Sequence, residues 1–372
     1  MAVKIMEKCC GLNFFLLTLR IEKNYHMSVK KPKILLIYTG GTIGMIENPD
    51  TKALEPFDFN HLLDNVPKIK MLDFEIDNFQ FDVPIDSADM NPSYWGQIAK
   101  VIEDNYSKYD GFVILHGTDT MAYTASALSF MLNNLTKPVI ITGSQLPIGE
   151  VRTDGEENLI TALQVAAAKD PADGGPMVRE VAILFQDSLL RGNRSTKFSA
   201  DNFDAFQSSN YPELAHIGLD ITYNKDALLR PTKGKEFKVE YLMDTNVAYL
   251  DIFPGIQENV VRATFNIPGL KGVVIKTFGV GNGPSSPWLF DCIRDAVANG
   301  LLIVNISQCS NGMVSPMKYS AGVGLANAGT ISGHDLTSEA AITKMMYLFG
   351  MGATPQLAGK YMEKNLHGEL TE

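Results

Sequence analysis

The sequence contains few of the residues that build disulfide frameworks and metal sites. Among 372 residues there are four cysteines and six histidines. Cys9 and Cys10 are adjacent, and Cys292 and Cys309 stand alone, so there is no C-x-x-C pair and no regular cysteine spacing. No H-E-x-x-H pattern occurs. We therefore expect no disulfide scaffold, no metal and no cofactor, and a reducing, cytoplasmic location.

Long apolar runs and an excess of positive charge are also missing. No stretch reaches the roughly 18 apolar residues that a membrane helix needs. Lysine and arginine number 32 against 42 aspartates and glutamates, a net charge of −10. Because such a surface repels a phosphate backbone, we expect neither a nucleic-acid nor a membrane partner. The composition, 45% hydrophobic and 20% charged, is that of a globular chain long enough for two domains.

Residues 1–31 differ from the rest of the chain. An apolar run over 12–19 follows two lysines, as in a signal peptide, but charged residues come directly after it and no small-residue cleavage site is present. Met27 lies just before the first strong strand pattern. We interpret 1–31 as an N-terminal extension that is disordered or precedes the true start, with Met27 as that start.

Apolar runs typical of strands alternate with helical patterns between residues 33 and 187. Asn91 and Pro92 have the residue types of a helix N-cap and first helical position. The strand runs are continuously apolar, which indicates a parallel sheet covered by helices on both faces. These runs are Ile34–Tyr38, Gly111–Leu115, Val139–Thr142 and Val181–Phe185.

A second α/β pattern follows a stretch without core residues. Residues 216–238 lack hydrophobic periodicity and are predicted to be a linker. Strand patterns return at 247–250, 273–277 and 301–305. The predicted fold class is therefore α/β with two α/β domains: a larger, flavodoxin-like parallel-sheet domain over 32–215 and a smaller α/β domain over 239–372.

Ligands of open parallel sheets bind beyond the carboxyl ends of the strands. The first such loop is Thr39–Gly44, in which three glycines permit close backbone approach and Thr42 offers a hydroxyl. A tight turn would explain this loop equally well on its own. A P-loop is excluded because no G-K-[ST] follows, and the G-x-G-x-x-G pattern also fails.

The second loop, His116–Met121, carries an imidazole, two hydroxyls and a carboxylate. Thr118 or Asp119 alone could be a helix cap, and we interpret His116 as a hydrogen-bonded structural residue. Another loop ends in Lys197. Basic loops are usually solvated, but a lysine beside a threonine hydroxyl would favour the alkoxide.

The two loops Thr39–Gly44 and His116–Met121 together resemble those of the L-asparaginase family. The resemblance extends from about residue 32 to 372 and is closest to the cytosolic type I bacterial enzymes. Further matching segments are Lys137–Gln145, Arg191–Lys197, Gly279–Gly283 and Asn305–Cys309.

This resemblance implies hydrolysis of L-asparagine to L-aspartate and ammonia. Thr42 matches the nucleophile, which forms an acyl-enzyme that water opens. Thr118, Asp119 and Lys197 match the second group of catalytic residues, in which the lysine eases deprotonation of the Thr118 hydroxyl. Backbone N–H groups of these loops would hold the oxyanion.

The resemblance also implies how asparagine is bound. Ser87 would bind the α-carboxylate and Asp119 the α-ammonium, and relatives are often homotetramers in which a neighbouring subunit completes the site. Some relatives bind asparagine at a second, regulatory site. The matching substrate-binding residues are Asp86, Ser87, Ala88, Thr118, Asp119 and Asn282, and the matching regulatory residues are Thr196, Arg262 and Cys309.

Two departures from the family pattern stand out. The family usually has a tyrosine in the lid shortly after the nucleophile, but residues 48–56 contain none, and none occurs between Tyr38 and Tyr94. Either another group activates Thr42 or the loop is aligned differently. Ala88 occupies a position where relatives often have serine.

Two alternatives stay open, and a third, the amidotransferase component, is disfavoured. A glutaminase-asparaginase of relaxed specificity would differ by one methylene, worth about 1–3 kcal/mol. The amidase component of a tRNA-dependent amidotransferase shares the core motifs, but it carries an added N-terminal domain. The other open alternative is a catalytically weak asparagine-binding protein.

Overall fold

The computed structural model describes residues 31–47, 54–56, 66–232, 234–316 and 319–372. The chain divides into two units, Met1–Pro32 and Lys33–Glu372, and the second is described below. The predicted extension over 1–31 and its start at Met27 lie outside the described residues, apart from Lys31, and so does most of the lid stretch 48–56.

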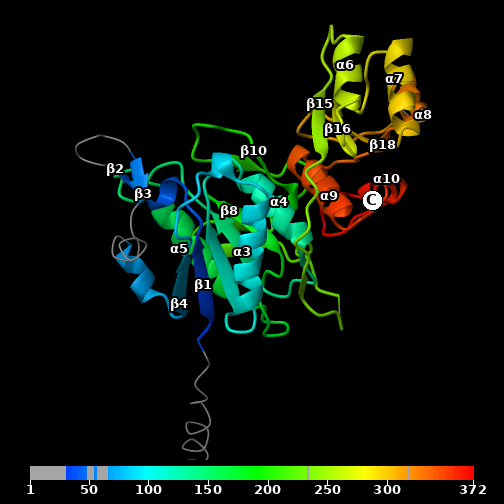
Figure 1. Cartoon of the computed structure of the whole chain (residues 1–372). Coiled ribbons are helices and arrows are strands. Elements are labelled where there is room, and N and C mark those ends of the chain that lie inside the picture. The colour runs from blue at the N-terminus through cyan, green and yellow to red at the C-terminus, as the bar shows by residue number, and fades with distance from the viewer. Residues whose placement is uncertain (1–30, 48–53, 57–65, 233, 317–318) are drawn as a thin grey trace, which may run out of the picture. The chain divides into compact units, whose positions relative to one another are not determined.

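The larger of the two main sheets has eight strands in the order β13-β12-β9-β8-β7-β5-β1-β4 (Figure 1). Five of them are parallel, and their order β4-β1-β5-β7-β8 is the 2-1-3-4-5 order of flavodoxin-like folds. The parallel strands are β4 (Glu75–Gln80), β1 (Lys33–Tyr38), β5 (Gly111–Leu115), β7 (Val139–Thr142) and β8 (Val181–Phe185). The antiparallel strands are β9 (Ser188–Arg191), β12 (Ala215–Ile217) and β13 (Ile221–Tyr223).

The parallel direction changes at β9 because only two residues separate β8 from β9. Such a loop closes a hairpin, whereas a parallel crossover needs a dozen residues or more. The four predicted strands are present as β1, β5, β7 and β8. Strand β4 was not predicted because it is the outer strand of the sheet, and its polar sequence EIDNFQ is largely exposed or half-buried.

Helices cover both faces of this sheet. Residues such as Leu35 and Ile37 face α3 (Pro92–Asn105) and α4 (Met121–Met131), whereas Ile34 and Leu36 face α5 (Gly155–Ala167). The α3 helix begins as predicted, since the Asn91 side chain accepts a hydrogen bond from Ser93 N at 3.0 Å.

The structure corrects the expected linker over 216–238. Residues 215–223 form the β12–β13 hairpin of the large sheet, and β14 (Lys238–Val239) pairs with β6 (Leu132–Asn133). These strands were missed because they are two or three residues long and partly polar, too short for an alternating pattern. The second domain's sheet begins only at Val247.

The smaller sheet has four parallel strands in the order β15-β16-β17-β18. Helices α6, α7 and α8 share one of its two hydrophobic clusters, while α9 and α10 share the other together with Phe130 of α4. Phe130 thus lies where α9 packs against α4, and this packing joins the two domains (Figure 1). The bounds are β15 (Val247–Asp251), β16 (Gly272–Thr277), β17 (Leu302–Ser307), β18 (Ile331–Ser332), α6 (Glu258–Phe265), α7 (Pro287–Ala298), α8 (Ser320–Ala328), α9 (Ser338–Gly350) and α10 (Pro355–Met362).

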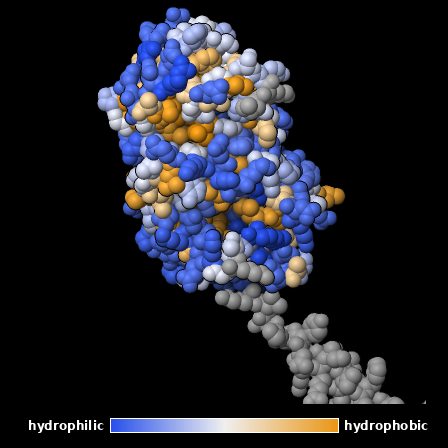
Figure 2. All heavy atoms as spheres, turned by 90° about the vertical axis from the view of Figure 1, so that its right-hand side faces the viewer, coloured by the Kyte–Doolittle hydropathy of each residue, from blue (hydrophilic) through white to orange (hydrophobic). Residues whose placement is uncertain are grey.

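Short elements complete the described part of the chain: β2 (Met45–Glu47) pairs with β3 (Leu54–Pro56), and β10 (Thr196–Lys197) pairs with β11 (Phe206–Gln207). Within the described ranges, no helix combines the length and apolar character needed to cross a bilayer. On the face shown in Figure 2, hydrophilic side chains predominate and hydrophobic ones form separate small groups.

Candidate active site

The loop that carries Thr42 lies directly against the loop that follows β5. Gly40 and Gly41 have φ angles of 136° and 94°, which L side chains rarely adopt. A Cβ on Gly41 would lie 2.4 Å from the backbone N of Gly117, and a Cβ on Gly40 would lie 2.2 Å from the carbonyl oxygen of Ile85. Only glycine at these positions lets the first loop reach its two neighbours.

The third segment at this place is the turn Ser87–Asp89. Ser87 is buried, and a Cβ added to Gly117 would lie 2.5 Å from its Oγ. Its carbonyl accepts a hydrogen bond from the Thr120 hydroxyl at 2.6 Å. Three segments therefore meet beyond the carboxyl ends of β1 and β5, where the strand order reverses and ligands of such sheets bind.

Asp86 begins this turn as its cap. The Asp86 carboxylate accepts a hydrogen bond from Ala88 N at 2.9 Å, and both residues are exposed. The side chain of Asp86 therefore holds the turn that presents Ser87.

Lys197 joins the segment Arg191–Lys197, the lysine loop, to the loop after β5. Its Nζ donates to Thr118 Oγ1 at 2.8 Å and to Asp119 Oδ1 at 2.7 Å. The Lys197 side chain is 16% exposed and that of Asp119 is 68% exposed, so the ammonium is sheltered while the carboxylate faces solvent. A positive charge this close to the Thr118 oxygen stabilises the alkoxide over the neutral hydroxyl.

The buried His116 side chain anchors the start of the second loop through hydrogen bonds. Trp95 Nε1 donates to Thr124 Oγ1 at 3.0 Å, the Thr124 hydroxyl contacts His116 Nε2 at 2.9 Å, and His116 Nδ1 contacts the Gly117 carbonyl at 2.7 Å. The Gly117 carbonyl can only accept, so Nδ1 carries the proton of the neutral His116 ring, and Nε2 accepts from the Thr124 hydroxyl. Burial lowers the pKa of His116 to about 4, which keeps the ring neutral. The histidine thus has the structural role that the sequence predicts.

Two residues near the site carried no functional prediction. Gln145, just after β7, has its Oε1 3.5 Å from Thr118 Oγ1, and its backbone N donates to the Asp154 carboxylate. Tyr38 is buried under the first loop, and its hydroxyl donates to the Gly44 carbonyl at 3.0 Å. Burial raises the pKa of Tyr38 to about 12. The sequence signal that could have found Tyr38 and Gln145 is their position at or just after the end of a core strand.

Asn282, Arg262 and Cys309 of the second domain make no described contact with this cluster, whereas Thr196 is the neighbour of Lys197 in β10. Asn282 forms a β-bridge with Phe278 in the loop after β16. Thr196 Oγ1 donates to Glu339 Oε1 at 2.6 Å, Arg262 pairs with Glu258 and Asp295 on α6 and α7, and Cys309 is exposed after β17. No described contact joins Thr196, Arg262 and Cys309, and Figure 1 shows α6 well separated from β10.

Among the described residues, no group of three or more histidine, cysteine or acidic side chains is arranged to hold a metal ion. The loops at the site offer hydroxyls, one ammonium, one carboxylate and backbone N–H groups.

Comparison with known families accounts for both domains. Residues 33–229 match the family described as "Asparaginase, N-terminal", and residues 246–362 match "Glutaminase/Asparaginase C-terminal domain". The chain belongs to the asparaginase family. The family predicted from Thr39–Gly44 and His116–Met121 is thereby confirmed.

Individual relatives agree with this assignment. The chain is 41% identical to L-asparaginase 1 of Escherichia coli over 92% of this chain and 99% of that protein. It is 47% identical to the 60 kDa lysophospholipase of Mus musculus, over 77% of this chain and 49% of that longer protein. The crystal structure of L-asparaginase I from Vibrio cholerae superposes with a TM-score of 0.83 at 40% identity, covering 92% of this chain and 100% of that one. The predicted two-domain α/β fold is confirmed by this match.

Proposed function

We propose that this protein is an L-asparagine amidohydrolase that releases L-aspartate and ammonia through a threonine nucleophile. The observation that carries the proposal is the contact of Lys197 with both Thr118 and Asp119, beside the turn that begins at Thr42. That arrangement supplies two hydroxyls, one sheltered cation and one exposed anion within touching loops.

Substrate binding follows from charge. The exposed Asp119 carboxylate would hold the α-ammonium, and the Ser87 hydroxyl at the turn capped by Asp86 would hold the α-carboxylate. Ala88 is the middle residue of the same turn. Because asparagine is small, these few contacts must fix its side-chain amide relative to Thr42.

The chemistry divides into two steps. Thr42 Oγ1 attacks the side-chain amide carbon and loses its proton. The C–N bond breaks and ammonia leaves with that proton, so that an ester remains on Thr42. Water then attacks the ester, which releases aspartate and regenerates the Thr42 hydroxyl. We assign Thr118 to proton transfer, because the Lys197 ammonium lowers the cost of its alkoxide.

A glutaminase-asparaginase is the nearest alternative. The described site has no feature that rejects one more methylene, which costs only about 1–3 kcal/mol. Ammonia release from glutamine and from asparagine, compared as kcat/KM, separates the two activities. A lysophospholipid should be tested alongside, since the name of the murine relative refers to that substrate.

Ammonia release also tests the nucleophile. Thr42→Ala should lose nearly all activity, and an acyl-enzyme should be trapped by rapid acid quench in the wild type but not in the variant. An asparagine-binding protein without catalysis would release no ammonia in either form. Full activity in Thr42→Ala would overturn the assignment of Thr42.

We further propose a cytoplasmic homotetramer in which Asn282 of a neighbouring subunit reaches the site. Thr196, Arg262 and Cys309, which no described contact joins within one chain, would serve a regulatory asparagine site in that assembly. The resemblance of Gly279–Gly283 and Asn305–Cys309 to type I enzymes supports this. Sedimentation velocity tests the tetramer. One binding event per chain in calorimetry, together with hyperbolic saturation, would remove the regulatory site.

A further inference from the structure

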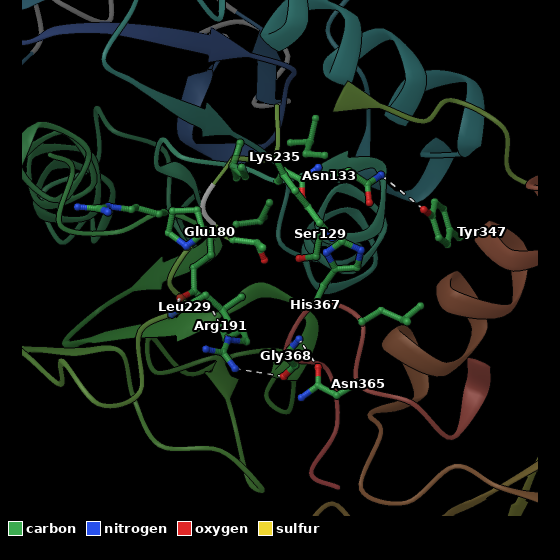
Figure 3. Close-up of a pocket in the computed structure, with 18 of the residues that line it drawn as sticks. Ser129, Asn133, Glu180, Arg191, Leu229, Lys235, Tyr347, Asn365, His367 and Gly368 are labelled. Atoms are coloured by element: carbon green, nitrogen blue, oxygen red, sulfur yellow. Dashed lines mark hydrogen bonds and ion pairs between the residues drawn. The ribbon is translucent and has the colours of Figure 1, made fainter. Parts of the chain in front are cut away.

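The carboxyl-terminal segment Asn365–Thr371 runs along the base of the loop that carries Lys197. Asn193 Nδ2 donates to the His367 carbonyl at 3.0 Å. The next carbonyl, that of Gly368, accepts from Arg194 Nε at 2.8 Å and from Arg191 Nη1 at 3.2 Å, the second of which Figure 3 shows. Three side chains of one turn thus bind two consecutive carbonyls, and that turn ends three residues before Lys197.

The segment is itself fixed to the second domain by a buried ion pair. Lys344 of α9 and Glu369 lie 2.6 Å apart, and both side chains are 0% exposed. The Glu369 carboxylate also accepts from Leu366 N at 3.0 Å and from His367 N at 2.6 Å. These bonds therefore fix the position of the His367 and Gly368 carbonyls, which accept from the side chains of the turn.

A second attachment lies at Asp335. Its carboxylate accepts from Arg194 Nη1 at 2.8 Å and from Thr371 N at 2.8 Å. The Thr371 hydroxyl in turn accepts from Arg194 Nη2 at 3.2 Å. Arg194 is therefore held on every guanidinium nitrogen by the second domain and the terminal segment.

One side of the segment lacks close packing. A cavity of about 590 Å³ is bordered by Arg191, His367 and Gly368, and Figure 3 shows the His367 ring pointing into it toward Ser129. Apolar packing and polar bonds together hold the segment, because Leu370 is fully buried in the cluster that contains α9 and α10, and the His367 ring meets the Phe130 ring edge-on with centroids 5.8 Å apart.

We propose that Asn365–Thr371 is a positioning element for Lys197. By holding Arg191, Asn193 and Arg194, it sets the place of the ammonium relative to Thr118. This rests on the proposed role of Lys197 in catalysis. The segment touches no atom assigned to substrate and acts only through Lys197, so its loss should lower kcat more than it raises KM, to which Lys197 contributes through Asp119.

The test combines Asn193→Ala with Thr371→Val, which removes two of these bonds without changing Lys197. We expect kcat to fall about tenfold or more, equivalent to ~1.4 kcal/mol. The part of the profile in which kcat rises with pH should move to higher pH. A displaced ammonium stabilises the Thr118 alkoxide less. Thr371→Ser should keep the wild-type profile.

Thr354→Val is the matched control. Its hydroxyl caps α10 by accepting from Leu357 N at 3.3 Å, so its loss removes a hydroxyl bond in the same domain away from the lysine loop. Both kcat and the pH profile should be unchanged in this variant. If the double variant does not fold, Thr371→Val against Thr371→Ser decides the question.

Lys197→Met separates the positioning role of the terminal segment from the catalytic role of Lys197. If Lys197→Met is inactive while the double variant Asn193→Ala, Thr371→Val keeps the wild-type kcat and pH profile, the positioning role alone is overturned. Full activity of Lys197→Met would overturn the proposed catalytic role of the lysine, and the positioning role with it.

Discussion

At the scale of single residues, the proposed chemistry depends on one sheltered ammonium group. Lys197 is bonded to Thr118 and Asp119, and substitution by methionine keeps the length of the side chain but removes the charge. We expect Lys197→Met to lower kcat by about 10²–10⁴, the range for a lost proton-transfer contribution. Ammonia release at saturating asparagine measures this.

A surface lysine provides the comparison for that experiment. Lys238 has a side chain that is 70% exposed, and its loss should change neither kcat nor stability appreciably. Equal losses in Lys238→Met and Lys197→Met would mean that the effect is not specific to the site.

His116 makes a separate prediction about stability and pH. Its pKa is lowered by burial from 6.5 to about 4, so the unfolded chain binds the proton more readily than the folded one between those values. Stability should therefore decrease as the pH falls from 7 toward 4.5, by about 2 kcal/mol from this residue. Urea unfolding at the two pH values should show a smaller decrease for His116→Gln. An equal decrease in both proteins would contradict the assignment.

At the scale of loops and strands, two glycines decide whether the site can form. In Gly41→Ala the added Cβ would lie 2.4 Å from Gly117 N, at a backbone φ of 94°. The two loops must then separate, and we expect kcat to fall by at least about 10², because a displacement of 1 Å can cost that much.

Gly174→Ala is the control for backbone strain without a clash. Gly174 has a φ of 70° but no atom lies within 4 Å of an added Cβ. It should lose roughly 1 kcal/mol of stability and keep its activity. If Gly41→Ala remains fully active, the close approach of the two loops is not required.

The sequence predicted the elements whose signals are local. The Asn91 cap, the apolar runs of β1, β5, β7 and β8, and the polar loops behind them could all be read from neighbouring residues. The β12–β13 hairpin, edge strand β4 and the terminal segment could not, because pairing partners and carbonyl acceptors distant in sequence define them. The bonds from Arg191 and Arg194 to Gly368 span more than 170 residues and leave no local pattern.

At the scale of the whole molecule, the two domains are joined by α4 against α9 and by the terminal segment. The pair Lys344–Glu369 lies where that segment meets α9, and neither side chain is exposed. Burial of two charges is costly, but it is offset when the partners bond to each other and to the backbone, as here through the Met362 carbonyl and Leu366 N.

Removing one partner of this pair should therefore be worse than removing both charges. In Lys344→Met the Glu369 carboxylate stays buried without its cation, and we expect the free energy of unfolding to fall by about 3–5 kcal/mol. Adding Glu369→Gln should recover part of this loss, because the neutral amide no longer needs a counter-charge. Urea unfolding of the single and double variants measures the coupling. A double variant less stable than Lys344→Met would show that the pair's hydrogen bonds, rather than its charges, hold the terminal segment in place.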